Sequence, residues 1–431
     1  PTGPAYKAPE PGAPVAADIG WQEFLVDERL RRLVGLALGQ NRDLRIAALN
    51  VERSRAQYRI QRAELLPEVN ASAAASAQRV PEELSPTRQA TISHQKSLAV
   101  GLTAYELDFF GRIRSLKDRA LHQYFATEEA RRAAQISLVA EIANRYLALG
   151  ADLGRHALAR ETLATQEASY GLTKRRFELG VTSELDLRQS QTSVETARVD
   201  IARFTAQVAQ DRNALDLLVG TQVPPELLPG GLGPVSGLKD LSPGVPSEVL
   251  QRRPDIRQAE YLLQAANANI GAARAAFFPR IALTTSVGLG SAELSGLFKD
   301  GAATWAFSPQ LTVPVFAGGA NRANLDVAKV DRELLLAQYE KAIQGAFREV
   351  SDALAQWGTV GEQLSAQEAL VEAAAVTHRL SEARYRNGIE SYLAVLDAQR
   401  SLYAAQQNLI AVRLARVADL VTLYRVLGGG G

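Results

Sequence analysis

The sequence contains no cysteine and no methionine, and aromatic residues make up only 6% of it. Without cysteine the chain can form no disulfides and carry out no thiol chemistry, which fits a compartment where free thiols are a liability. The missing initiator methionine predicts a processed or trimmed chain, from which a signal peptide would already have been removed.

Sequence features typical of several protein classes are also absent. Lys and Arg number 48 against 47 Asp and Glu, and this balance argues against nucleic acid as a partner. The four histidines show no metal-ligand spacing, no glycine-rich phosphate loop follows a strand, and no nucleophile motif is present. We therefore expect no metal, no cofactor and no catalytic residue, and we predict that the chain is not an enzyme.

Long apolar runs are missing as well, because none reaches the ~20 residues that a membrane-spanning helix needs. If the chain crosses a membrane, it must therefore do so with β-strands. Proline is absent from residues 87–223 and 315–431, and both windows are rich in Ala, Leu, Arg, Gln and Glu. Such windows predict long helices.

The chain repeats itself. The segment 176–185 (RFELGVTSEL) parallels 384–393 (RYRNGIESYL), a shift of 208 residues that also relates Gly220 to Gly428. Upstream the shift is 212 residues and relates Pro67 to Pro279. The subunit is therefore predicted to be a tandem duplication.

Each repeat is expected to contain a helix, two strands, a long helix, a glycine turn and a return helix. At 1.5 Å per residue each long helix would span on the order of 100 Å, which predicts a tall, thin bundle. The expected domains are an N-terminal leader and equatorial segment (1–42), the first repeat (43–220), an equatorial linker (221–254), the second repeat (255–428) and a tail (429–431). The expected elements are opening helices 43–66 and 255–278, strands at about 67–80, 97–110, 279–290 and 305–316, long helices 112–179 and 320–387, and return helices 182–220 and 390–427.

The expected strands alternate between apolar and small or polar residues and are about ten residues long, the length of a transmembrane strand. In 97–104, for example, Leu98, Val100, Leu102 and Ala104 are expected on one face, while Phe residues gather near the strand ends. The alternative, a soluble sheet packed on the helices, remains open on the pattern alone. Four strands cannot close a barrel, and lipid does not tolerate an open sheet edge, so the membrane interpretation requires several subunits.

The return helices show a seam of apolar residues at spacings of three and four, typical of coiled-coil packing. Leu393, Asp397 and Arg400 are spaced i, i+4, i+7 and lie roughly opposite this seam. On an isolated helix Asp397 and Arg400 would be a solvated ion pair of little energetic value. In a ring of subunits the same residues would form a constriction with a leucine ring and a carboxylate ring.

Several stretches resemble the outer membrane factor (TolC-like) family, most closely its OprM-like branch of channels from tripartite multidrug efflux pumps. The resemblance runs nearly from end to end, and its most specific stretches are RPDI at 253–256, AANANIGAARAAFFP at 265–279, YELDFFGR at 105–112 and YLAVLDAQRS at 392–401. OprM-like proteins usually begin with a lipid-modified cysteine, and residues 1–6 resemble the segment just after that cysteine. A lipoprotein anchor in the native chain therefore stays an open alternative.

The resemblance implies a mostly α fold with membrane β: a trimer whose subunits each give four strands to a twelve-stranded β-barrel in the outer membrane. A long α-helical barrel and an equatorial domain would lie in the periplasm. It implies a passive exit duct of a multidrug efflux system, with a duct for type I protein secretion as the alternative. The implied partners are two further copies, outer-membrane lipid, a periplasmic adaptor (membrane fusion) protein and an inner-membrane RND transporter, with no nucleic acid.

The resemblance also implies site residues. Residues at the positions of Leu393, Asp397 and Arg400 form the closed periplasmic gate in the OprM-like branch. The helical tips, which in the family meet the adaptor, correspond here to Gly180, Val181, Thr182, Ser183, Gly388, Ile389, Glu390 and Ser391.

Overall fold

The computed structural model describes residues 19–85, 88–232 and 252–429. The chain divides into two compact units, and each draws segments from both sequence repeats. The helical unit comprises residues 1–49, 128–257 and 340–431, and the strand-bearing unit comprises 50–127 and 258–339. Much of the expected leader, most of the equatorial linker and the last two residues of the expected tail lie outside the described residues.

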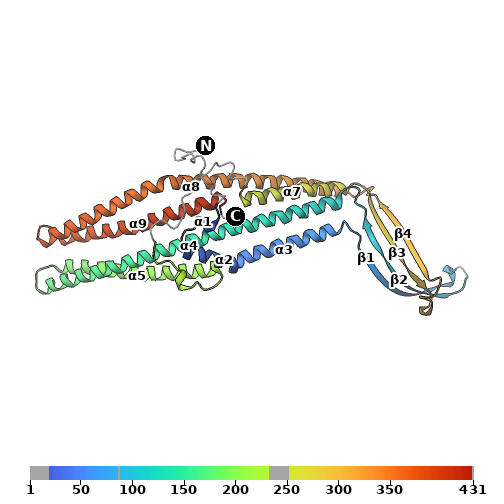
Figure 1. The fold of residues 1–431 in the computed structure, drawn as a ribbon, viewed down its shortest axis with the longest axis horizontal. Helices are drawn as coiled ribbons and strands as arrows, with labels where there is room; N and C mark the ends of the chain where they lie inside the picture. The colour runs from blue at the N-terminus through green and yellow to red at the C-terminus, as the bar shows by residue number, and fades with distance from the viewer. Residues whose placement is uncertain (1–18, 86–87, 233–251, 430–431) are drawn as a thin grey trace. The chain divides into compact units, whose positions relative to one another are not determined.

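Helices make up most of the described chain, and Figure 1 shows their order. The two longest begin at Arg112 and Ala320, the starts that the sequence predicted, while the helices that open each repeat end about three residues earlier than expected, ahead of Pro67 and Pro279. The helices are α1 (Trp21–Phe24), α2 (Glu28–Gln40), α3 (Arg42–Ala63), α4 (Arg112–Glu178), α5 (Glu184–Val219), α7 (Pro254–Ala275), α8 (Ala320–Arg386) and α9 (Tyr392–Val426).

The strand-bearing unit holds one antiparallel sheet in the order β1-β2-β3-β4, formed by β1 (Val69–Val80), β2 (Thr91–Glu106), β3 (Arg280–Ser291) and β4 (Ala303–Thr312). β2 begins six residues before the predicted start at 97, because the largely polar stretch 91–96 pairs with 75–80 and carries little apolar signal. β2 and β4 also end four residues earlier than predicted, β4 just before the Val313-Pro314 step.

The register of the sheet gathers its large apolar side chains on one face. Many of these side chains are exposed, with Val287 65% and Trp305 79% accessible in the single chain. Neighbouring positions on the opposite face are small or polar, as the sequence alternation predicts. One apolar row crosses all four strands through Ala71, Val100, Val287 and Trp305.

The apolar alternation of β2 is interrupted near its end. The register with β3 shifts between Leu102 and Tyr105, and Ala104 between them has φ +50°. Its amide is not left unpaired, since it donates to Thr284 Oγ1 at 3.1 Å. Ala104 therefore does not continue the row of Leu98, Val100 and Leu102 as the alternation suggests, because a bulge re-aims the following side chains.

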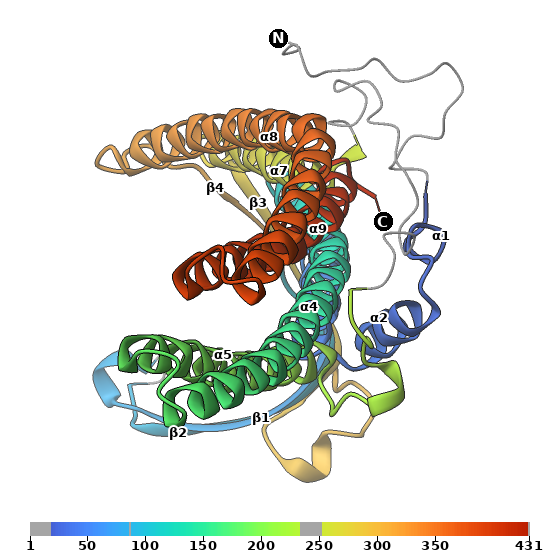
Figure 2. The ribbon, with the colours of Figure 1, turned by 90° about the vertical axis from the view of Figure 1, so that its left-hand side faces the viewer.

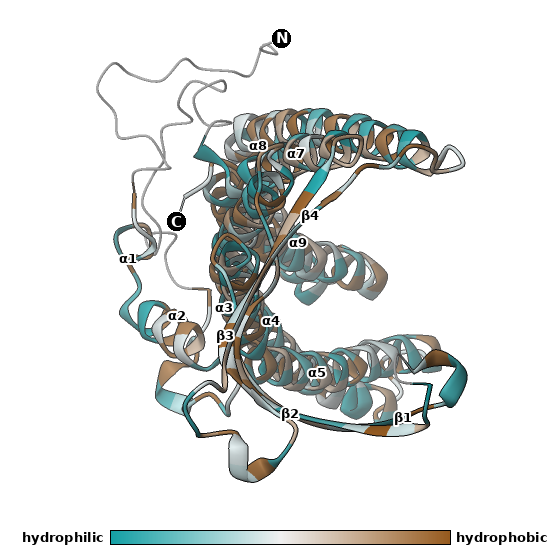
Figure 3. Ribbon diagram, turned by 90° about the vertical axis from the view of Figure 1, so that its right-hand side faces the viewer, coloured by the Kyte–Doolittle hydropathy of each residue, from teal (hydrophilic) through white to brown (hydrophobic). Residues whose placement is uncertain are grey.

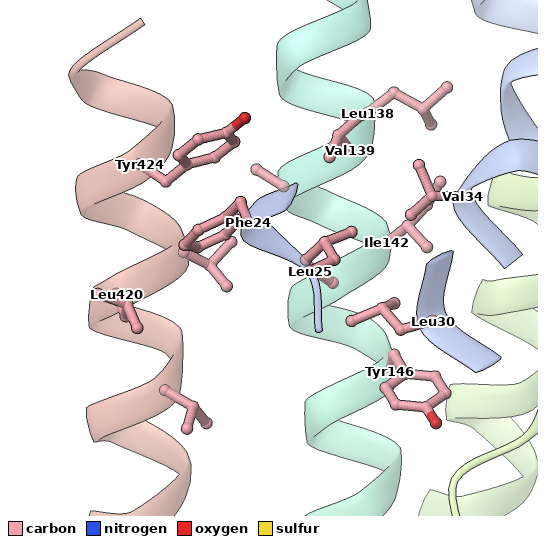
Figure 4. Packing of buried hydrophobic residues seen from close by; sticks show 14 of the residues in the cluster. Phe24, Leu25, Leu30, Val34, Leu138, Val139, Ile142, Tyr146, Leu420 and Tyr424 are labelled. Atoms are coloured by element: carbon pink, nitrogen blue, oxygen red, sulfur yellow. The ribbon is translucent and has the colours of Figure 1, made fainter. Parts of the chain in front are cut away.

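The core of the helical unit includes the short N-terminal helices, which the sequence analysis treated only as a leader and equatorial segment. The Phe24 ring stacks on Tyr424 of α9 with centroids 3.9 Å apart, and the Tyr424 hydroxyl donates to the Ile19 carbonyl at 2.6 Å. On α4, the Tyr146 hydroxyl donates to Asp27 Oδ2 at 3.0 Å. Figure 4 shows Phe24 between α9 and α4 and Leu25 against α4, and both belong to one buried cluster with Ile142 and Tyr424, so the segment around α1 packs on both helices.

A buried arginine fastens the start of α7 to two other helices of the helical unit. Arg253 is 7% exposed and donates to the Asp255 carboxylate, to Glu349 Oε2 of α8 at 2.8 Å and to the carbonyl of Val426 in α9 at 3.0 Å. The carbonyl lies in the last turn of α9, where the helix itself offers no amide partner. Arg253 thus satisfies two carboxylates and a helix end at once.

Hydrophobic and hydrophilic residues are mixed along the long helices in Figure 3. Within the described ranges, no helix combines the length and the apolar character required to cross a membrane.

Candidate functional site

Helix α9 carries the three residues expected at the gate, and all three are exposed in the single chain. Leu393 is 47% accessible, and the Asp397 and Arg400 side chains form an ion pair at spacing i, i+3. The neighbouring face of the same helix, through Val395 and Ala398, is buried. The structure therefore brings Asp397 and Arg400 together and presents Leu393 on the accessible side of α9.

The apolar seams predicted for the return helices are the buried faces of α5 and α9. The seam of α5 is interrupted by Asp211, which is only 3% exposed and accepts from Gln207 Nε2 at 3.3 Å. Burial raises the pKa of the Asp211 carboxyl, and the nearby Asp152 on α4 raises it further. The members of the α5 seam that are buried are Leu187, Ser190, Val194, Ala197, Phe204, Asp211 and Leu215.

The two helical tips turn on glycine in both repeats. Gly180 and Gly388 have φ values of +73° and +72°, a conformation that costs other residues a steric penalty. Figure 2 faces the ends of the two hairpins, α4–α5 and α8–α9. The tips display apolar side chains to solvent, with Val181 65% and Ile389 64% exposed, as expected of a surface that meets a partner.

The first tip is locked by a capping box that the second tip lacks. Asp186 accepts hydrogen bonds from the Thr182 hydroxyl at 2.8 Å and from the Ser183 hydroxyl at 2.8 Å, and its own amide donates to Ser183 Oγ at 3.1 Å. The equivalent of Asp186 in the second repeat is Ala394, and Ser391 caps α9 without a side-chain hydrogen bond. There Glu390 instead accepts from Arg384 Nε at 2.9 Å.

This capping box leads to a pH-dependent prediction. Partial burial opposes ionisation of Asp186, but the hydrogen bonds from Ser183 and Thr182 outweigh it and lower its pKa. A lowered pKa means that the stabilisation is present above the unfolded-state pKa of about 3.9 and is lost as the pH falls through the folded pKa. Replacing Asp186 by alanine should destabilise the tip by about 1 kcal/mol at pH 7, and this difference should vanish at strongly acid pH.

Hydrogen exchange of residues 176–190, corrected for the intrinsic rate, measures this effect. At neutral pH the Asp186→Ala tip should exchange several-fold faster than the wild type. Glu184→Gln is the matched control, because Glu184 is an exposed neighbour that pairs only with Arg188 among the described residues. Equal exchange in Asp186→Ala and the wild type at pH 7 would rule out the capping box as the lock of this tip.

Three polar links join the first hairpin to the second. In each, a tyrosine hydroxyl from the second hairpin meets a polar group of α4 or α5. Burial, followed by the hydrogen bond to Asp200, raises the pKa of Tyr403 to about 12, so this hydroxyl keeps its proton at physiological pH. The links are Arg176 Nη1 to Tyr385 Oη at 2.9 Å, Ser169 Oγ to Tyr392 Oη at 3.0 Å, and Tyr403 Oη to Asp200 Oδ2 at 2.9 Å.

These tyrosines were not predicted from the sequence, although the internal repeat contains a signal for them. Under the shift of 208 residues, Tyr385, Tyr392 and Tyr403 correspond to a phenylalanine and two glutamates in the first repeat. At these three positions the two repeats carry different residues. They are also positions where the second hairpin contacts the first, a contact that the equivalent residues of the first repeat do not make. The partners lie over 200 residues away in the chain, so spacing alone could not identify them.

An amphipathic sheet with an exposed apolar face, together with two long helical hairpins linked by tyrosine hydrogen bonds, defines a class of protein: a membrane protein that inserts strands and also carries long helices. The profile of the family "Outer membrane efflux protein" matches residues 33–221 and 245–429. The chain belongs to this outer membrane efflux protein family.

Individual relatives agree. The probable efflux pump outer membrane protein TtgC of Pseudomonas putida is 50% identical over 430 residues, covering 100% of this chain and 89% of the relative. The crystal structure of a membrane protein from Pseudomonas aeruginosa has a TM-score of 0.93 at 45% identity, covering 99% of this chain and 97% of that one. The structure of the MtrE outer membrane channel of Neisseria gonorrhoeae, solved in its open state, has a TM-score of 0.87 at 39% identity. The match covers 99% of this chain and 97% of the MtrE chain.

These findings confirm the sequence-based identification of the family, the mostly helical fold with a small antiparallel sheet, and the efflux function. The chain is an outer-membrane component of an efflux system, located in the outer membrane and reaching into the periplasm.

Proposed function

We propose that three copies of this chain form a passive exit duct for a tripartite multidrug efflux system. The amphipathic sheet carries this proposal: its apolar face is exposed in the single chain, and β1 and β4 leave unpaired edges within the described sheet. Lipid does not tolerate unpaired backbone groups, so the edges require partners, and two further copies supply them. The duct catalyses no reaction and conducts what the rest of the system delivers.

The partners follow from the same geometry. The exposed apolar tips around Val181 and Ile389 fit a periplasmic adaptor, which would connect the duct to an inner-membrane RND transporter. The relatives named for efflux favour this role over a duct for type I protein secretion. Co-purification with a periplasmic adaptor should be lost when Val181 and Ile389 are both replaced by aspartate, and retained when the exposed Val199 of α5 is replaced instead.

Leu393, Asp397 and Arg400 are proposed to close the duct at the end that bears the tips. In a ring of three copies, three leucines and three carboxylates would meet their symmetry copies and narrow the passage. Adaptor contacts would open the gate only if they bind the open state more tightly than the closed one.

The link between Tyr403 and Asp200 should contribute to holding the gate shut, because it fastens α9 to the first hairpin. Tyr403→Phe removes a hydrogen bond to a charged group, worth about 1.5 kcal/mol or more, and should raise the open-to-closed ratio about tenfold or more in planar bilayers. Tyr170→Phe on α4 is the matched control, since its hydroxyl has no hydrogen-bond partner among the described residues. If Tyr403→Phe and Tyr170→Phe show the same open-to-closed ratio, the hydrogen bond between Tyr403 and Asp200 does not help to keep the gate closed.

A further inference from the structure

The charged side chains of the four strands lie at the two ends of the sheet, and those at only one end are paired. At the end that joins the helices, Glu106 forms ion pairs with Arg280 at 2.5 Å and with Arg112 at 2.8 Å. At the other end, which bears the two hairpin loops, Arg79 of β1 and Lys96 of β2 form no ion pair among the described residues. The charges of the loop end therefore lack a partner within the chain.

These basic side chains lie on the apolar face of the sheet. Lys96 is two residues from Leu98 on β2 and so shares its face, and His94 follows two residues further along. The unbroken register pairs Arg79 of β1 with Ile92 of β2, which places Arg79 on this face as well. The apolar face thus continues toward the loops as a basic surface, which consists of Arg79, His94 and Lys96.

The carboxylates of the loop end lie in the segments that connect the strands and not on the strands themselves. None of them forms an ion pair with Arg79 or Lys96 among the described residues. The side chains of Arg79 and His94 are exposed, and that of Lys96 is partly exposed, so all three can meet a ligand. The connecting carboxylates are Glu82, Glu83, Glu293 and Asp300.

The basic surface begins where the apolar face ends. Along β3 this face runs from Ile281 to Leu289, which is about 27 Å at ~3.4 Å per residue. Membrane strands carry an apolar band about 25 Å tall, so Lys96, paired with Ser291 just beyond Leu289, lies at the border of the hydrocarbon. A lysine costs little there, because its apolar stem lies along the band while the ammonium reaches the headgroups.

We propose that the basic surface binds a lipid whose headgroup carries phosphate monoesters, the chemistry of lipid A in the outer leaflet. The helices reach into the periplasm, so the loop end of the sheet faces that leaflet. Phosphate oxygens accept charge-assisted hydrogen bonds from Arg79 and Lys96, and His94 adds an N–H donor. The inference rests on the proposed insertion of the sheet into the membrane and gives its lipid a defined headgroup.

Diphosphoryl lipid A is the probe, added in increasing amounts to the delipidated full-length protein in a non-ionic detergent. Native mass spectrometry counts the lipid molecules that the assembled protein retains and yields an apparent affinity. A Lys or Arg near an anionic headgroup contributes about fivefold to binding. Arg79→Gln and Lys96→Gln should therefore each weaken retention about fivefold, and about 25-fold together. Lys174→Gln, which removes the same charge from an exposed position on α4, should bind like the wild type.

Two further measurements separate a lipid phosphate from other causes of binding. Phosphatidylcholine with acyl chains of the same length has no net charge, so the wild type should retain it more weakly and all variants should retain it equally. Inorganic phosphate should not displace lipid A, because it has no acyl chains to pack on the apolar face. Equal retention of the two lipids, equal weakening by Lys174→Gln, or displacement by inorganic phosphate would overturn the proposal.

The assembled mass separates this inference from the proposed duct. A trimer that retains both lipids equally contradicts the lipid preference alone, whereas a monomer contradicts the duct. Misfolding of the glutamine variants would be recognised by a loss of phosphatidylcholine retention, which depends on the apolar face and not on Arg79 or Lys96. Unchanged phosphatidylcholine retention with weakened lipid A retention is the result that the proposal requires.

Discussion

In planar bilayers the Asp397→Ala channel is expected to be open far more often than the wild type. In the closed ring each Asp397 would meet a charged group of a neighbouring copy, and losing three such exposed contacts, at about 0.2–1 kcal/mol each, would shift the closed-to-open equilibrium by up to ~3 kcal/mol, about a hundredfold. The loss of three carboxylates should also reduce any preference for cations over anions.

Asp326→Ala supplies the matched control. Asp326 pairs with Lys329 at the same i, i+3 spacing and with similar exposure, but on α8 in the strand-bearing unit. Conductance and open probability of this variant should match the wild type. If Asp397→Ala also matches it, Asp397 has no part in the gate, whatever the role of Leu393.

The second large effect concerns Arg253. Its replacement by leucine leaves the Asp255 and Glu349 carboxylates and the Val426 carbonyl without their donor at a site that is 7% exposed. The Asp255 and Glu349 side chains are 44% and 33% exposed, so water reaches both carboxylates, and the cost comes from the lost charge-assisted hydrogen bonds and the orphaned Val426 carbonyl, about 2–3 kcal/mol. Thermal unfolding of the purified protein in detergent should show a markedly lower melting temperature.

Arg413→Leu tests whether any lost arginine has this effect. Arg413 pairs with Glu368 between α9 and α8, yet its side chain is 45% exposed, so its removal should cost less than about 1 kcal/mol. A double variant, Arg253→Leu with Glu349→Leu, should recover part of the lost stability because one orphaned carboxylate is gone. Equal melting temperatures for Arg253→Leu and Arg413→Leu would contradict the prediction that Arg253 fastens α7 to α8 and α9.

The sequence predicted those structural features that depend on residues close together in the chain. Proline-free windows predicted α4 and α8, and the repeat paired Gly180 with Gly388, whose positive φ values make both turns. Two-residue alternation predicted the apolar face of the sheet, because a strand presents alternate side chains to opposite sides. The i, i+3 spacing of Asp397 and Arg400 likewise predicted their ion pair.

Contacts between distant segments were not predictable in the same way. Phe24 and Tyr424 stack although 400 residues separate them, and no sequence pattern around either residue indicates that the other is its partner. The early start of β2 at Thr91 was missed because its polar residues pair through the backbone, which leaves no apolar signature. The tyrosine links between the hairpins depend on tertiary packing and emerge only from the coordinates.

The most direct test of the proposed duct combines mass and conductance. The chain would be purified in detergent, its assembled mass determined by native mass spectrometry, and the same sample added to a planar bilayer. We predict a trimer that gives discrete, low, cation-favouring conductance, as a mostly closed duct with a carboxylate ring requires. A monomer that stays soluble without detergent and gives no conductance would contradict the account.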